Sequence, residues 1–304
     1  MLRAGPAPPG CPALRAAAAC PYDGKVRLRL YHHSDGARVA YREFGAGPPL
    51  ALLHSGLLSH KEWEPVVEQL TDRFRVVLPD LPLHGDSEHG SSHPYTLDWF
   101  AEVLAGFSAE VLGPRPLVAG HGYGAQVLLE AVGSGRIRPA RMVLMSNHLH
   151  SKPARRPALL AIRALAAAAA VPGLDRPLSH AAAAAVRPER AARLTVRGNA
   201  SAEDLLRHAF SGVAGNAELA RSWARCVRSW PHGAQAQLLA LYPSLQMPVL
   251  LLWADRDPLH PIAPAEEALR LLPRGQLRVL QSTGFLMAYD DPVGLGRELV
   301  AFCG

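Results

Sequence analysis

A strand, a glycine-flanked turn and a helix are predicted to follow one another between Val118 and Ala131 (VAGHGYGAQVLLEA). A tight turn of this kind presents its central residue to substrate, and that residue is a serine when the turn serves nucleophilic catalysis. In GHGYG the central residue is Gly122, which has no side chain. Glycine adopts the strained backbone of such a turn without penalty, so we expect the turn to form although its nucleophile is absent.

Four further segments carry polar residues where predicted strands end. They are His54-Ser55-Gly56 after PLALL, PDLPLHGDSE (residues 79–88), LLLWADRDPLHP (250–261) and STGFLMAYDDP (282–292). Together with the turn at Gly122, and in this order, they resemble the motifs of the α/β-hydrolase family over roughly residues 25–304. The resemblance implies an α/β fold with a mostly parallel sheet, helices on both faces and an inserted helical cap.

The resemblance also implies a Ser-His-Asp triad, of which this sequence retains the acid alone. The family pattern places the acid at Asp257, whereas Gly122 stands at the serine position and Phe285 at the histidine position. Loss of one triad member costs about 10⁴ to 10⁶ in turnover, so we expect no hydrolysis by this triad. The backbone N–H of Tyr123, with that of Gly56 or Leu57, is expected to retain an oxyanion site.

Several other side chains near strand ends are candidates for contact with a ligand. They are His54, Ser55, His121, His148, His150 and His260, in addition to the residues of the degenerate triad and the oxyanion site. Each histidine also has a structural interpretation, in packing a loop or capping it. The pair His148-x-His150 has no third ligand at suitable spacing, so the sequence predicts neither a metal site nor a cofactor.

Asp257 and two serines leave alternatives open. In an apolar pocket the pKa of Asp257 is expected to rise toward a value useful for a general base, and otherwise the carboxylate serves as a polar anchor for backbone N–H groups. Ser55 and Ser146 are either substitute nucleophiles or ordinary residues of a loop and a strand end.

Alternating apolar runs and helical patterns set the expected domain organisation. Residues 1–24 are rich in Pro, Gly and Ala and are expected to be a flexible extension. Residues 25–147 are expected to form the first part of the core, residues 148–240 the helical cap, and residues 241–304 the second part of the core. No strand pattern is visible in the cap segment.

The composition is that of an ordinary globular chain, with 304 residues, 49% of them hydrophobic and 19% charged. The four cysteines, at positions 11, 20, 226 and 303, show no Cys-x-x-Cys spacing, which favours reduced thiols and a cytoplasmic location. No convincing secretory signal is present, and the stretch Ala158–Leu174 contains too much alanine to form a membrane span.

Positive charge is concentrated in the expected cap. Residues 150–240 contain thirteen Lys and Arg against five acidic residues, a formal charge of +8. Two arginine series have helical spacing: Arg187, Arg190, Arg193 and Arg197, and Arg221, Arg225 and Arg228. They are either a solvated helix face or a surface for an acidic small molecule, an acidic carrier protein or a membrane surface. Nucleic acid is not expected, because no interleaved aromatic residues accompany the arginines.

Three hypotheses about function follow. The leading one is a non-hydrolytic enzyme that binds a small, partly apolar carbonyl compound and promotes cyclisation, isomerisation, an aldol-type reaction or decarboxylation, for example in secondary-metabolite biosynthesis. The second is an inactive module that binds a ligand or a protein. The third is a hydrolase that uses a displaced histidine, His148 or His260, and a water held by Asp257.

Overall fold

A computed structural model describes part of the chain in detail. It covers residues 27–304 except 91, 153–156, 169–170, 172, 175–176, 178–179, 182–193, 197, 210–215 and 232. The expected extension at residues 1–24 therefore lies outside the described residues, as do Cys11, Cys20 and the arginine series from Arg187 to Arg197.

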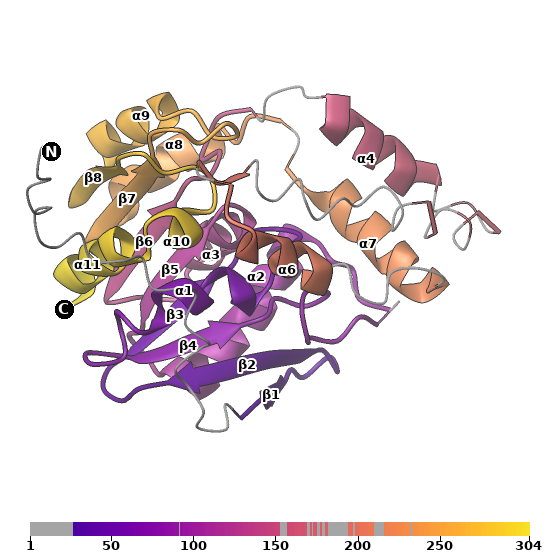
Figure 1. Ribbon diagram of the computed structural model, residues 1–304, viewed down its shortest axis with the longest axis horizontal. Coiled ribbons are helices and arrows are strands. Elements are labelled where there is room, and N and C mark those ends of the chain that lie inside the picture. The colour runs from indigo at the N-terminus through magenta and orange to yellow at the C-terminus, as the bar shows by residue number, and fades with distance from the viewer. Residues whose placement is uncertain are drawn as a thin grey trace, which may run out of the picture.

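Eight strands form one sheet, coloured from indigo to yellow along the chain in Figure 1. The strands are β1 (Arg29–His32), β2 (Arg38–Phe44), β3 (Pro49–Leu53), β4 (Arg75–Pro79), β5 (Leu117–His121), β6 (Arg141–Met145), β7 (Val249–Ala254) and β8 (Gly275–Leu280). Their order across the sheet is β1-β2-β4-β3-β5-β6-β7-β8. Strand β2 is antiparallel to β1 and β4, and every other neighbouring pair is parallel. The predicted α/β class with a mostly parallel sheet is confirmed.

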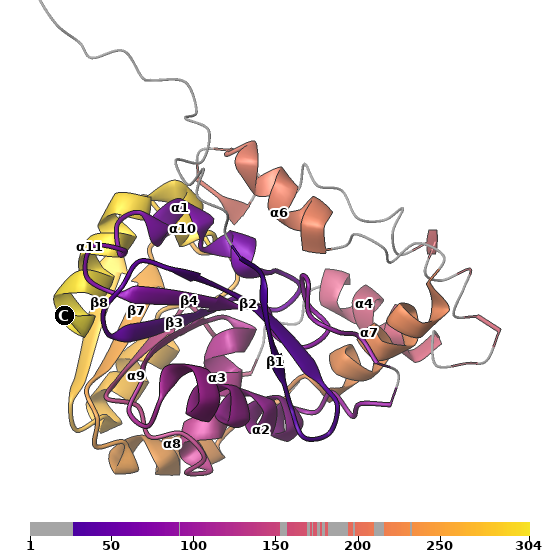
Figure 2. The ribbon, with the colours of Figure 1, turned by 90° about the horizontal axis from the view of Figure 1, so that it is seen from below.

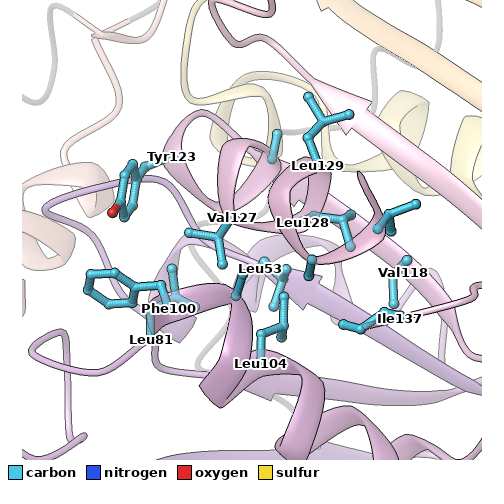
Figure 3. Packing of buried hydrophobic residues seen from close by; sticks show 14 of the residues in the cluster. Leu53, Leu81, Phe100, Leu104, Val118, Tyr123, Val127, Leu128, Leu129 and Ile137 are labelled. Carbon is cyan, nitrogen blue, oxygen red and sulfur yellow. The ribbon is translucent and has the colours of Figure 1, made fainter. Parts of the chain in front are cut away.

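Helices cover both faces of this sheet (Figure 2). One face packs on α2 (Leu97–Phe107), α3 (Tyr123–Gly133), α8 (Gln237–Leu241) and α9 (Ala263–Leu271), and the other on α1 (Glu64–Val67), α10 (Met287–Asp290) and α11 (Pro292–Cys303). The central strands are buried on both sides, which explains why PLALL and VLLLWA are continuous apolar runs. Figure 3 shows the first face, where Leu53 and Val118 of the sheet lie beneath Val127 and Leu128 of α3.

In the described part of the chain, three further helices lie beyond the sheet layers, two of them at the right of Figure 1 and the third, α6, near its centre. They are α4 (Pro157–Ala168), α6 (Ser201–Ala209) and α7 (Ala217–Ser229). Helices α4 and α7 pack against each other through Ala166, Ala224 and Val227. These helices belong to the segment 148–240 that we propose as a cap. Among the described helices none combines the length and the apolar character needed to cross a bilayer.

The sequence pattern predicts helices over Leu58–Leu70 and Thr96–Leu112, with Thr96 as the N-cap of the second, and the two predictions have different outcomes. Thr96 caps α2 as predicted, since its side chain accepts a hydrogen bond from the N–H of Trp99 at 3.3 Å, and a π-helical turn, η2 (Ser108–Leu112), extends this helix. The predicted helix over Leu58–Leu70 is wrong in extent. A 3₁₀ turn, η1 (His60–Glu62), precedes the short α1, because Pro65 has no N–H to continue the ladder of η1. A second 3₁₀ turn, η4 (Tyr242–Ser244), follows α8.

A buried histidine makes the stability of this fold sensitive to pH. His84 is 1% exposed, and burial lowers its pKa to about 3. The unfolded chain protonates this ring below about pH 6.5, so its contribution is fully present above that pH and is lost as the pH falls toward 3. We expect a slope of about 1.4 kcal/mol per pH unit from this residue between pH 6 and 4.

Urea unfolding between pH 7 and 4.5 measures this slope. His84→Gln is expected to remove about one proton from the pH dependence. His89→Gln, at an exposed position in the neighbouring loop, is expected to retain the wild-type slope. Equal slopes for the wild type and His84→Gln would contradict the prediction.

Candidate active site

The turn between β5 and α3 keeps the geometry of a nucleophile elbow. Gly122 has φ +51° and ψ −114°, in the left-handed region that favours glycine. The flanking glycines are required by close packing. A Cβ at Gly120 would lie 2.8 Å from the backbone of Ala125, and one at Gly124 would lie 2.5 Å from the carbonyl oxygen of His54. The elbow is therefore formed in full, without the side chain that it usually presents.

The proposed oxyanion donors lie on two adjoining segments. A Cβ at Gly56 would lie 3.2 Å from the Cβ of Tyr123. Among the described residues, no group accepts a hydrogen bond from the N–H of Gly56, Leu57 or Tyr123. Leu57 has φ +66°, a strained conformation for a residue with a branched side chain. An oxyanion site requires N–H donors that are not already bonded, and these three N–H groups meet that requirement. Either Gly56 or Leu57 is suited to be the second donor.

Asp257 is paired with a histidine from its own loop. Its Oδ2 lies 3.0 Å from Nδ1 of His260, and its Oδ1 accepts hydrogen bonds from the N–H groups of Leu259 at 2.6 Å and His260 at 3.3 Å. The Asp257 side chain is fully buried, and that of His260 is 7% exposed. A carboxylate–imidazole pair of the kind found in a triad is thus present within one loop. The assignment of Phe285 to the histidine position of the family stays a prediction.

The expected rise in the pKa of Asp257 is wrong. Burial does push this pKa upward, but the hydrogen bond and charge of His260, together with the N–H of Leu259, outweigh burial and lower the pKa. An ionised Asp257 orients His260 and is not itself suited to take a proton at neutral pH. Within this pair, the imidazole is the group suited to accept a proton.

A second carboxylate–imidazole pair includes His121, which precedes the elbow, and an acid that the sequence did not indicate. Glu62 is 2% exposed, and its Oε1 pairs with Nδ1 of His121, which is 1% exposed. The other oxygen of Glu62 accepts the N–H of Ser55 at 2.7 Å. Since Nδ1 of His121 faces the carboxylate, its Nε2 is left buried without a hydrogen-bond partner among the described residues.

Phe285 fills the space between the two pairs. Its ring centroid lies 4.4 Å from that of His121 and 5.5 Å from that of His260. The ring of His148 lies 4.5 Å beyond His260. The charge of His121 also contributes to lowering the pKa of Asp257, so the two pairs are electrostatically connected. The structure therefore places His121 and His260 against one aromatic ring, with Asp257 and His148 in contact with His260.

Two predicted ligand-binding histidines make structural contacts elsewhere. His150 lies 3.0 Å from Glu267 of α9 and 3.4 Å from the hydroxyl of Tyr242. Nε2 of His54 accepts the N–H of Leu81 at 2.9 Å, so its Nδ1 carries the proton and donates to the carbonyl of Ser55 at 2.8 Å. Burial lowers the pKa of His54, which is consistent with this neutral tautomer.

A group of metal-ligand residue types forms a separate cluster that the sequence did not indicate. In the described part of the chain, ligand atoms of His60, Asp80, Asp86 and His208 lie within 4.8 Å of one another. The guanidinium of Arg42 lies 3.6 Å from Asp80 and pairs closely with Asp86. Because this cation already supplies positive charge to both carboxylates, we interpret the cluster as an ion-pair network. The expectation that the protein needs no metal or cofactor stays a prediction.

Comparison with known proteins assigns the family. A family model described as alpha/beta hydrolase fold matches residues 48–292. The chain belongs to the α/β-hydrolase fold family. An esterase from Thermogutta terrifontis with malate bound has 22% identity and a TM-score of 0.71, over 91% of this chain and 98% of that one. An α/β-hydrolase fold protein from Burkholderia ambifaria has 19% identity and a TM-score of 0.74, over 91% and 99%. At these identities the likeness shows the fold alone.

Sequence relatives of this α/β-hydrolase fold protein include an uncharacterized protein and an esterase. An uncharacterized protein of Mycobacterium tuberculosis is 23% identical over 88% of this chain and 77% of its own length. A pimeloyl-[acyl-carrier protein] methyl ester esterase of Methylococcus capsulatus is 42% identical, but over only 29% of this chain and 32% of its own length. These matches do not distinguish hydrolysis from another activity of the fold.

Proposed function

We propose that this α/β-hydrolase fold protein is a non-hydrolytic enzyme that works by acid–base catalysis. It binds a small, partly apolar carbonyl compound above Gly122 and promotes cyclisation, isomerisation, an aldol-type step or decarboxylation. The observation that carries the proposal is the buried Asp257–His260 pair at 3.0 Å, in a protein whose elbow has no side chain at Gly122. A base without a nucleophile suits proton transfer better than acyl transfer.

The proposed chemistry begins with removal of a proton from the carbon next to the substrate carbonyl. The imidazole of His260 takes this proton, and Asp257 stabilises the imidazolium that results. The N–H of Tyr123, with that of Gly56 or Leu57, stabilises the enolate oxygen. Return of the proton to another carbon gives isomerisation. Attack of the enolate carbon on a second carbonyl gives an alkoxide, which takes the proton back from the imidazolium of His260 to yield an aldol-type or cyclised product. Decarboxylation of a β-keto acid reaches the same kind of enolate by loss of carbon dioxide, and a protonated His260 then donates a proton to its carbon.

Hydrogen–deuterium exchange at carbon tests this chemistry without knowledge of the natural substrate. We expect the protein to accelerate exchange of the acidic C–H groups in a panel of β-keto esters and 1,3-diketones in D₂O, measured by NMR. His260→Gln and Asp257→Asn are each expected to slow this exchange by about 10² to 10⁴. His32→Gln, at an exposed position of β1, serves as the matched control and is expected to retain the wild-type rate.

The alternatives give different results in the same samples. Turnover of activated aryl esters that is lost in Asp257→Asn, without exchange at carbon, would contradict the proposal and favour hydrolysis by water held at Asp257 and His260. Binding of the diketones without exchange or ester turnover would favour a ligand-binding module.

A binding module is the second candidate because aromatic residues pack closely over the elbow. A Cβ at Gly56 would lie 3.3 Å from the ring of Trp230, and the ring of Trp230 lies 5.6 Å from that of Tyr123. Tyr123 is 8% exposed, and its ring lies 5.6 Å from that of Phe100, on the same side of the cluster in Figure 3. Burial raises the pKa of its hydroxyl well above the ordinary value, so this group stays neutral.

An acidic carrier protein or another anionic ligand is the partner that we propose for the cap. Arg221, Arg225 and Arg228 are exposed along one side of α7. The name of the Methylococcus capsulatus relative refers to an acyl-carrier protein, and a basic surface suits an acidic partner of this kind. A cytoplasmic location likewise stays a prediction.

A further inference from the structure

The hydroxyl of Ser55 lies where the side chain of an elbow serine would begin. A Cβ built on Gly122 would lie 2.1 Å from Oγ of Ser55 and 2.9 Å from its Cβ. Contacts this short do not occur between side chains, so positions 55 and 122 cannot both carry a side chain in this conformation. The hydroxyl that is absent from the elbow is therefore present in the facing loop.

The backbone of Ser55 is held by three hydrogen bonds. Its N–H donates to Glu62 at 2.7 Å, and its carbonyl accepts from Nδ1 of His54 at 2.8 Å and from the N–H of Leu58 at 3.1 Å. Two of these partners, His54 and Glu62, are at most 2% exposed. A hydroxyl on such a backbone is preorganised, which is the condition under which a hydrogen-bond donor stabilises developing charge most strongly.

We propose that Ser55 is a catalytic residue whose hydroxyl donates a hydrogen bond to the substrate oxygen, as a side-chain donor beside the N–H groups of Tyr123 and Gly56 or Leu57. This inference rests on the proposed function and adds a residue to its oxyanion site. Among the described residues no group is hydrogen-bonded to Oγ of Ser55, so the hydroxyl retains its capacity to donate. No imidazole is bonded to it there either, and a serine without a base is a donor and not a nucleophile.

The steric part of the inference is tested by thermal unfolding of a double-mutant cycle. Gly122→Ala is expected to lower the Tm by several degrees. The new Cβ collides with Ser55, and the alanine must adopt a strained φ. The loss of Tm has two causes, the contact with Ser55 and the strained φ. Ser55→Gly in the same chain removes the contact, so the double variant is expected to regain most of that share of the Tm. Losses that add without coupling would overturn the placement of Ser55 against Gly122.

The functional part is tested by calorimetric titration with cyclohexane-1,3-dione, an enolate at neutral pH. We expect Ser55→Ala to weaken binding about tenfold or more, as for loss of a hydrogen bond to a charged oxygen. Ser59→Ala is the matched control, because this serine lies in the same loop and its buried Oγ has no partner among the described residues. It is expected to bind as the wild type does.

Three results of the binding, exchange and labelling experiments would overturn the inference, and they differ in whether they also reject the proposed function. Equal dissociation constants for the wild type and Ser55→Ala, with C–H exchange that still depends on His260, would reject the role of Ser55 alone. No binding and no exchange in the wild type would reject the proposed function as well. Labelling of Ser55 by a fluorophosphonate, located by peptide mass spectrometry, would identify it as a nucleophile.

Discussion

Replacement of Glu62 by alanine is expected to lower the free energy of unfolding by about 3–5 kcal/mol. The carboxylate accepts from two buried groups at once, the N–H of Ser55 and Nδ1 of His121, and its removal leaves both without an acceptor. A buried donor that loses its only partner pays the full cost of its desolvation. Urea unfolding monitored by circular dichroism at pH 7 measures the loss.

Glu64→Ala is the matched control for this experiment. Glu64 lies two residues further along, its side chain is 44% exposed, and its contact with His60 is at 3.8 Å. A long ion-pair contact with one partner exposed to solvent contributes at most about 1 kcal/mol. Similar losses for Glu62→Ala and Glu64→Ala would show that the buried network does not hold the loop and the elbow together.

Asp80→Ala, at a second buried carboxylate, is also expected to lower the free energy of unfolding by about 3–5 kcal/mol. The side chain of Asp80 is fully buried and accepts hydrogen bonds from the N–H of His60 at 2.6 Å, from Nδ1 of His60 at 3.0 Å and from the N–H of Asp86 at 2.9 Å. Arg42 lies 3.6 Å away and would lose one of its two carboxylate partners. Urea unfolding at pH 7 measures this loss too.

The pH dependence of the free energy of unfolding, which follows from the pKa of Asp80, provides a second test. Burial alone would raise this pKa, but the hydrogen bonds and charge of His60 lower it to about 2. The stabilisation is therefore fully present above about pH 4 and is lost as the pH falls through 2. Asp98→Ala, at a side chain that is 64% exposed, is the control and is expected to cost less than about 1 kcal/mol. A small loss for Asp80→Ala at pH 7 would contradict the prediction.

The fold could be predicted from local sequence. Buried parallel strands need continuous apolar runs, and the elbow needs glycines at close contacts, so both leave a pattern in the chain. The order of the motifs then predicts triad positions at Gly122, Asp257 and Phe285, and this assignment stays a prediction. Gly122 follows β5 directly, whereas Asp257 and Phe285 lie in the loops after β7 and β8.

The partners of these residues could not be predicted in the same way. Glu62 meets His121 across 59 residues of sequence, and in KEWE it has the appearance of an ordinary acidic residue on a helix surface. The lowered pKa of Asp257 could not be predicted, because it depends on the path of the loop that turns His260 back onto the carboxylate. The contact between Ser55 and Gly122 could not be predicted either, because it depends on how two segments pack.

Asp290 joins the expected cap to the loop that carries Phe285. Its carboxylate accepts the N–H of Val196 at 3.0 Å and the N–H of Gly284 at 2.8 Å, and the N–H of Leu286 donates to the carbonyl of Leu194 at 3.1 Å. A shift of the chain at residues 194–196 must therefore either break these bonds or pull the aromatic ring away from the two imidazoles. Displacement of this segment and exposure of the imidazoles of His121 and His260 to solvent are therefore coupled through Asp290.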